Sequence, residues 1–286
     1  GNLLKITLPD SLTSIGASAF ENCESLLSID IPGTVKSIGM TAFRNCNGIT
    51  AVVIPASVTQ IGERVFEGCG SLENITVAAG NTVYHSDGNC LIETNSKTLI
   101  EGSNTCVIPS DGSVVHIGRY AFYGRSGLRE VAIPQGVVTI GINAFSDCDN
   151  LAKVTIGEDV LIIEAGAFRN CKGLKELVIP DNVTQLDNAA FVGCNRLEKI
   201  TLPYVASLAG ATWQYHFGGI FGAIDESQNA SFVPSSLKLV VITGGSQIGA
   251  NAFKGCSFIT GILLPNSITD IGQSAFEGCS DLTAIF

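Results

Sequence analysis

The chain has 286 residues, of which 45% are hydrophobic and only 15% are charged, and it contains 32 glycines. This composition excludes a disordered polypeptide, because apolar side chains are plentiful enough to form a core. The net charge of −10 opposes binding to nucleic acid or to an anionic membrane surface, since both partners require clustered Lys and Arg. Because no apolar run approaches the roughly 20 residues that span a bilayer, we also expect no membrane insertion.

A single motif, I-G-x-x-A-F-x-x-C, recurs along the chain at intervals of 23 residues. A fixed period of this length is typical of a solenoid, in which each unit buries its apolar side chains against its neighbours. We therefore predict one elongated array of about nine to ten repeats, forming a single domain over residues 1–286. The sequence starts without Met and stops where a further strand is due, so we expect a fragment of a longer protein. Nine repeats keep a phenylalanine at the same place: Phe20, Phe43, Phe66, Phe122, Phe145, Phe168, Phe191, Phe253 and Phe276.

Each repeat begins with an alternating stretch such as Leu26, Ile29 and Ile31, which predicts a short strand with one face buried. A proline then ends the strand, because proline lacks the amide hydrogen that a sheet requires. A second extended piece, V-T-x-I, leads to a glycine, for which we expect positive φ at a corner. Glu164 and Asp187 replace this glycine, so the corner does not need positive φ in every repeat. The A-F-x-x-C segment that follows has the spacing of one helical turn with Phe and Cys pointing inward.

The first interruption of the period lies near residues 81–106. Polar residues 94–97 separate two apolar runs, residues 90–92 and 98–100, which is the pattern of a β-hairpin. We predict that residues 81–100 form a hairpin that projects from the array.

The second interruption, near residues 203–236, holds aromatic side chains that the regular repeats lack. It contains the only tryptophan, Trp213, together with Tyr215, His216 and Phe217. Aromatic side chains of this kind stack on sugars or anchor protein partners, so these four residues are candidates for partner binding. The alternative is that they only hold the inserted segment against the flank of the array.

The repeat L-x-x-I-x-L-P-x-x-L-x-x-I-G-x-x-A-F-x-x-C resembles that of the BspA-type leucine-rich-repeat family, and the resemblance covers both interruptions. It implies an α/β repeat solenoid: a right-handed leucine-rich-repeat superhelix with short parallel strands and short helical turns. It also implies an extracellular or cell-surface location in bacteria and a role in adhesion or protein binding, without enzyme activity.

Ten cysteines in a chain of this kind invite a disulfide interpretation. Side chains at one phase of a solenoid point in parallel directions and do not converge, so we expect the in-phase cysteines to be reduced and buried. Cys90 and Cys106 are out of phase, and a bridge between them stays open. No C-x-x-C or His-Cys cluster predicts a metal site. The in-phase cysteines are Cys23, Cys46, Cys69, Cys148, Cys171, Cys194, Cys256 and Cys279, and Arg125 takes the ninth place.

Charged residues occupy the exposed strand positions of four successive repeats. Opposite charges on neighbouring strands contribute about 0.2–1 kcal/mol each, so one interpretation is charge neutralisation along a stacked face. The alternative is the footprint of a charged ligand. The residues are Arg129, Glu130, Lys153, Lys175, Glu176, Glu198 and Lys199.

Sequence signatures of catalysis are missing, since the three histidines are scattered and no nucleotide-binding or nucleophile motif appears. We therefore expect no enzyme activity and no cofactor. Two classes of function stay open. The first is a monomeric interaction or adhesion module that binds a protein or, as a variant, a glycan. The second is a structural spacer that presents another domain.

Overall fold

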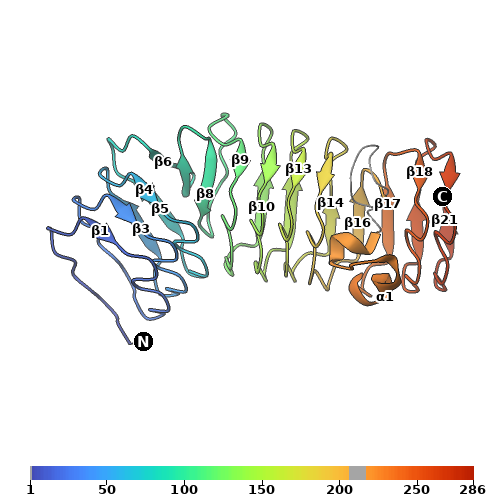
Figure 1. Cartoon of the computed structure of the whole chain (residues 1–286), viewed down its shortest axis with the longest axis horizontal. Coiled ribbons are helices and arrows are strands. Elements are labelled where there is room, and N and C mark those ends of the chain that lie inside the picture. Colours follow the sequence, from blue (N-terminus) through green and yellow to red (C-terminus); the bar gives the residue numbers. More distant parts are fainter. Residues whose placement is uncertain (1, 206–216) are drawn as a thin grey trace.

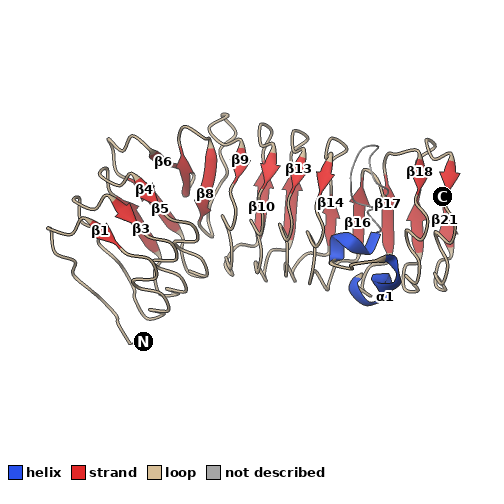
Figure 2. Ribbon diagram, viewed as in Figure 1, coloured by secondary structure: helices blue, strands red, loops and turns tan. Residues whose placement is uncertain are grey.

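The computed structural model describes residues 2–205 and 217–286. In these residues the chain winds into a β-solenoid of about 11 turns, which follow one another in an elongated row (Figure 1). Parallel strands predominate and there is little helix (Figure 2). The predicted repeat solenoid is therefore confirmed, with slightly more turns than the nine to ten repeats expected.

One face of the solenoid is formed by the first strand of each repeat. Buried and exposed side chains alternate along these strands, as in β3 (Ala51–Ile54), where Val52 and Ile54 are buried. Partner strands are parallel and pair residues of equal phase, such as Glu130 with Lys153. They form three separate sheets, β3-β5, β10-β12 and β14-β16-β17-β19-β21. The other strands of this face are β5 (Asn74–Val77), β10 (Glu130–Ile133), β12 (Lys153–Ile156), β14 (Glu176–Val178), β16 (Lys199–Leu202), β17 (Leu239–Ile242), β19 (Gly261–Leu263) and β21 (Ala284–Ile285).

A second set of two-residue strands precedes the corner of each repeat. They too pair in parallel, in the sheets β1-β2-β4, β15-β13-β11-β9 and β18-β20. The strands are β1 (Ser14–Ile15), β2 (Ser37–Ile38), β4 (Gln60–Ile61), β9 (His116–Ile117), β11 (Thr139–Ile140), β13 (Ile162–Ile163), β15 (Gln185–Leu186), β18 (Gln247–Ile248) and β20 (Asp270–Ile271).

At Gly39 and Gly62 the corner glycine is favoured by close approach of the preceding turn rather than by its φ angle. None of Gly16, Gly39 and Gly62 has positive φ, so that prediction is wrong. A Cβ added to Gly39 would lie 2.4 Å from the backbone nitrogen of the preceding turn's Ala17, much closer than atoms can approach. At Glu164 the side-chain carboxylate accepts a hydrogen bond from the Ile142 N–H of the preceding turn (2.8 Å).

The A-F-x-x-C segment differs from the expected helical turn because it is a run of tight turns that contain left-handed residues. Backbone hydrogen bonds join Ala42 to Gly39, Arg44 to Thr41 and Cys46 to Phe43, each spanning three residues. The left-handed positions lie two and six places after the corner, where side chains other than glycine are strained unless short and polar. In the first three repeats they are Ser18, Asn22, Thr41, Asn45, Arg64 and Gly68.

The phenylalanines form a buried column along the axis. Phe145 is fully buried and stacks on Phe122 (4.7 Å between ring centroids) and on Phe168 (5.2 Å). Two phenylalanines from the second insertion continue the column: Phe221 lies 6.3 Å from Phe191, and Phe217 lies 4.7 Å from Phe253.

The first insertion forms an antiparallel three-stranded unit, β6 (Tyr84–Asp87), β7 (Cys90–Glu93) and β8 (Thr98–Gly102), and the predicted turn at residues 94–97 joins its last two strands. Strand β8 pairs in parallel with β9, so the unit is part of the array's sheet. Leu91, Ile92 and Leu99 are fully buried. The hairpin is confirmed, but the prediction that it projects from the array is wrong.

The described part of the second insertion contains two short 3₁₀ helices, η1 (Phe217–Phe221) and η2 (Glu226–Gln228), and the helical turn α1 (Asn229–Phe232). Asn229 is buried, and its side-chain oxygen accepts a hydrogen bond from the Gly218 N–H (3.0 Å), which ties α1 to η1. No helix in the described ranges is long and apolar enough to cross a membrane.

The buried residues fall into two clusters that meet at the first insertion, and the N-terminal turns are tilted relative to the rest of the row (Figure 1). In regular turns a cysteine thiol donates to the carbonyl of the phenylalanine 26 residues earlier, as Cys148 does to Phe122 (3.0 Å). Arg125 stands in the place of such a cysteine and reaches back across the insertion to the carbonyl of Phe66 (2.9 Å). The guanidinium thus makes at position 125 the type of contact that a thiol makes in the regular turns.

Arg125 is fully buried, and its charge is compensated within the core. It donates to the carbonyls of Gly102 (2.7 Å) and Cys69 (3.3 Å) and forms an ion pair with Glu101. Burial raises the pKa of Glu101 to about 7, while the neighbouring Arg125 opposes this rise. The two residues join the two core clusters.

Candidate functional site

Seven charged side chains lie at the start of four neighbouring strands, as their phase in the repeat predicts. Four of them, Glu130, Lys153, Glu176 and Lys199, are the first residues of β10, β12, β14 and β16, where they alternate with buried or half-buried residues and face outward. The other three directly precede these strands and are exposed. Glu130 is in register with Lys153, and Glu176 with Lys199. We call Arg129, Glu130, Lys153, Lys175, Glu176, Glu198 and Lys199 the charged face.

Four of these residues neutralise one another across β14 and β16. Lys175 pairs with Glu198 (3.3 Å), and Lys199 pairs with Glu176 (3.7 Å). The side chains of the first pair are each 57% exposed, so solvent screens the interaction and each pair contributes at most about 1 kcal/mol. These distances support the neutralisation interpretation for this half of the face.

The other half of the charged face is not neutralised in this way. In the part of the chain that the structure describes, Arg129, Glu130 and Lys153 take part in no ion pair. All three are exposed. Charged groups that are not committed to a neighbour remain available to a partner.

The aromatic candidates of the second insertion are only partly placed. Phe217 is 2% exposed and packs in the phenylalanine column, so we leave it out of any surface contact. Phe221 is buried in the same column. Trp213, Tyr215 and His216 lie outside the described residues.

The cysteines divide as their phase in the repeat indicates. The eight in-phase cysteines are free thiols, whereas Cys90 and Cys106 form a disulfide across 16 residues. Burial raises the pKa of Cys69, Cys148 and Cys194 to about 12, which keeps these thiols protonated and unreactive at neutral pH. Sequence analysis predicted reduced, buried thiols but did not predict their hydrogen bonds to phenylalanine carbonyls.

Mass spectrometry of the denatured protein, alkylated without reductant, is expected to show eight modified cysteines and one linked pair, Cys90 with Cys106. Replacing both linked cysteines with alanine should lower the free energy of unfolding by about 3 kcal/mol. The reason is that a disulfide closing a loop of this length restricts the conformations of the unfolded chain, and the variant loses this restriction. Ten modified cysteines, or a linked pair among the in-phase positions, would contradict the assignment.

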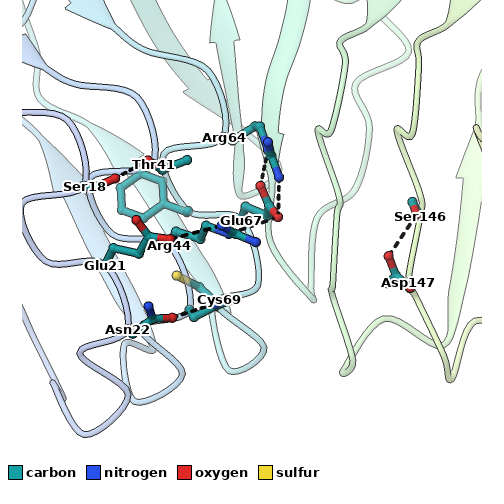
Figure 3. Close-up of polar contacts among 12 residues, drawn as sticks. Ser18, Glu21, Asn22, Thr41, Arg44, Arg64, Glu67, Cys69, Ser146 and Asp147 are labelled. Carbon is teal, nitrogen blue, oxygen red and sulfur yellow. Dashed lines mark hydrogen bonds and ion pairs between the residues drawn. The ribbon is translucent and has the colours of Figure 1, made fainter. Parts of the chain in front are cut away.

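A chain of ion pairs runs between residues 21 and 67, along the turns that precede the first insertion (Figure 3). Arg44 pairs with Glu21 (3.0 Å) and with Glu67 (3.3 Å), and Glu67 also pairs with Arg64. The Arg64 guanidinium lies over the ring of Tyr120, 4.7 Å from its centroid, and so reaches across the first insertion. Sequence analysis missed this chain, although Glu21, Arg44 and Glu67 share one phase of the repeat.

Among residues 2–205 and 217–286, no group of three or more His, Cys, Asp and Glu side chains is placed to hold a metal ion. The charged face and the ion pairs of the first turns lie along one extended row of turns (Figure 1).

A family model for BspA-type leucine-rich-repeat regions matches the chain in 6 copies, over residues 1–111, 103–215 and 224–286. The chain belongs to this family. None of the curated proteins compared with this BspA-type chain matches it.

Solved structures support the same fold. A leucine-rich-repeat protein from Bacteroides ovatus is 27% identical and aligns with 97% of this BspA-type chain and 58% of its own, with a TM-score of 0.57. A leucine-rich cell-surface protein from Faecalibacterium prausnitzii is 25% identical over 97% of this chain and 58% of its own, with a TM-score of 0.52. The pneumococcal vaccine antigen PcpA shows the same fold with a TM-score of 0.69, at 22% identity over 93% of this chain and 67% of its own. This chain therefore spans 58% of the length of the first two proteins.

Proposed function

We propose that this chain is a non-enzymatic interaction module of a bacterial surface or secreted protein, and that the charged face contacts its partner. The observation that carries the proposal is the row of outward-facing side chains on β10, β12, β14 and β16, held at fixed spacing by the parallel pairing of β10 with β12 and of β14 with β16. Residues on a rigid sheet are well suited to recognition, because little conformational entropy is lost on binding.

An extracellular location is supported by two independent observations. The Cys90–Cys106 disulfide is of the kind that persists in oxidising surroundings outside the cytosol. The similar Faecalibacterium prausnitzii protein is described as a cell-surface protein. A role in adhesion is a more specific proposal than a location outside the cell, and it requires a direct binding test.

That test is to probe an array of extracellular-matrix proteins and glycans with the fluorescently labelled chain. We expect saturable binding to at least one spot, weakened about tenfold by the double variant Arg129→Glu/Lys153→Glu, because two charges available to a partner change sign. A matched control, Lys36→Glu, reverses an exposed charge away from the charged face and should bind normally.

Both variants must keep the melting temperature of the unmodified chain for the comparison to hold. A chain that binds no spot would count against an interaction module and would favour a spacer. Binding that survives the double variant would move the contact to another surface.

A further inference from the structure

The turn that follows the corner at Gly62 is only partly bonded to the turn that follows the first insertion. Between regular turns, the N–H groups two, four and six places after the corner donate to carbonyls of the next turn, as in Thr41 (3.1 Å), Phe43 (2.9 Å) and Asn45 (2.8 Å). After Gly62 the last of these bonds is kept, from the Gly68 N–H to the Tyr123 carbonyl (3.2 Å). The two bonds nearer the corner have no counterpart among the described residues.

The groups that would form these two bonds are left without their regular partners. The Gly102 N–H of the insertion donates to the Ala121 carbonyl (2.7 Å), which is the acceptor that the repeat predicts for the Phe66 N–H. The Arg64 N–H and the Arg119 carbonyl, which the repeat would pair with each other, form no hydrogen bond within residues 2–205 and 217–286. A backbone donor and a backbone acceptor therefore remain free between the two corners.

A cavity of about 290 Å³ lies at this place. It is lined by residues 61–66 of one turn, residues 118–119 of the other, and side chains of the insertion that include Leu91 and Ile100. Leu91 is fully buried, and Ile61 and Ile100 are half-buried, so part of the wall is apolar. Pockets for drug-sized ligands measure about 300–1,000 Å³, so this cavity suits a smaller molecule.

The cavity also has one uncommitted charge of each sign. Of the charged residues in its lining, Arg64 and Glu101 form ion pairs with residues outside the lining, and Figure 3 shows the pair of Arg64. Glu63 and Arg119 are exposed and take part in no ion pair in the described part of the chain. Each stands one place after its corner, so the two turns bring a carboxylate and a guanidinium to the same cavity.

The backbone at Arg64 adds a second kind of observation. Arg64 has a φ of 61°, at the place where other turns carry the short side chains of Ser18, Thr41 and Asn143. A long side chain in this left-handed conformation is strained, and strain of this kind concentrates at sites that bind ligands. The guanidinium lies over the ring of Tyr120, 4.7 Å from its centroid, which holds the strained residue beside the cavity.

We propose that this cavity is a binding site for a free amino acid with an apolar side chain. The carboxylate of the ligand accepts hydrogen bonds from the Arg64 N–H and the Arg119 guanidinium. Its ammonium group donates to the Glu63 carboxylate and the Arg119 carbonyl, and its side chain contacts Ile61 and Ile100. A zwitterion satisfies both free backbone groups and both free charges at once, and hydrogen bonds between charged groups are the strong ones. This inference goes beyond the proposed function, because the charged face lies on other strands.

The test is an NMR titration of the intact chain with free L-leucine and L-valine, because NMR also measures weak affinities. The amide signal of Arg64 is expected to shift and to saturate with at least one of the two. Two relatives of L-leucine serve as matched compounds: isocaproate lacks the ammonium group, and L-leucinamide lacks the carboxylate. Each should bind about tenfold more weakly than L-leucine, because each loses one charged hydrogen-bonding group.

Two variants assign each end of the ligand to one side chain. Arg119→Gln should weaken the binding of L-leucine about tenfold but leave that of L-leucinamide unchanged, since the amide has no carboxylate to lose a partner. Glu63→Gln should weaken L-leucine equally but leave isocaproate unchanged. Both side chains are exposed, so the melting temperature should stay that of the unmodified chain. Arg196→Gln, which removes an exposed arginine outside the cavity, is the control and should bind L-leucine normally.

If neither amino acid shifts a signal of the cavity at concentrations up to its solubility limit, the site is refuted. Equal affinities for L-leucine, L-leucinamide and isocaproate, or variants that bind L-leucine as the unmodified chain does, would overturn the recognition of a zwitterion. These outcomes are independent of the binding array, whose variants change charges on β10 and β12 and none in the cavity lining. The amino-acid site and the proposed function can therefore fail separately.

Discussion

Replacing Arg125 with cysteine, the residue that eight other repeats carry at this position, is expected to destabilise the protein by about 3–5 kcal/mol. The substitution restores the repeat motif, but it removes the guanidinium that donates to the Phe66 carbonyl (2.9 Å) and to the Gly102 carbonyl (2.7 Å). It also leaves Glu101 buried without its positive partner. The two core clusters then lose the side chain that joins them. Urea denaturation followed by circular dichroism measures the loss.

The pH dependence of this loss has a defined sign. Burial already raises the pKa of Glu101 to about 7, and removing Arg125 takes away the group that opposes the rise. A carboxyl whose pKa is higher in the folded state stabilises the fold fully at low pH and loses that contribution as the pH rises through the folded-state pKa. The variant should therefore be closer to the unmodified chain at pH 5 than at pH 8.

Two further variants make the Arg125 result interpretable. Lys172→Ala breaks an exposed ion pair with Asp149 (3.0 Å) and should cost less than about 1 kcal/mol. Adding Glu101→Gln to Arg125→Cys should recover part of the stability, because it removes the uncompensated charge. A single Arg125→Cys variant that is as stable as the unmodified chain would show that the joint does not depend on this pair.

Truncating Phe145 to alanine is expected to cost about 3–5 kcal/mol, since the side chain is fully buried and stacks on both neighbouring turns. Phe276 is the matched control, because it is partly exposed and stacks on Phe253 alone among the described residues (5.5 Å). Phe276→Ala should cost clearly less. Equal losses for the two variants, measured by urea denaturation, would contradict a column stabilised by stacking between turns.

The regular turns could be predicted from the sequence because two periodic patterns agree: the alternation of buried and exposed residues along each strand, and the 23-residue repeat along the chain. Alternation along a strand fixes which side chains are buried, and the repeat places residues such as Glu176 and Lys199 in register on one face. The position of the charged face followed directly from this phase. Which of its charges form ion pairs did not follow, because the distances depend on side-chain conformations that phase does not specify.

The insertions were harder because they break the phase. Leu91, Ile92 and Leu99 are apolar enough to indicate burial, yet their spacing alone could not show that β8 joins the array's sheet. Phe217 was a candidate for partner binding, with packing of the insertion against the array as the alternative, and it takes the place of a missing phenylalanine of the column. The contacts of Arg125 with Phe66 and Glu101 could not be predicted, because the sequence does not show which residues meet across the first insertion.

The tilt between the N-terminal turns and the rest of the row has a geometric consequence for recognition. Strands β3 and β5 run at an angle to β10 and β12, and the change of direction lies at the first insertion (Figure 1). A flat, rigid partner can therefore rest on one block of turns but not on both. A partner that contacts both blocks must be curved or must change direction at the bend, so the molecule selects its partners by shape as well as by charge.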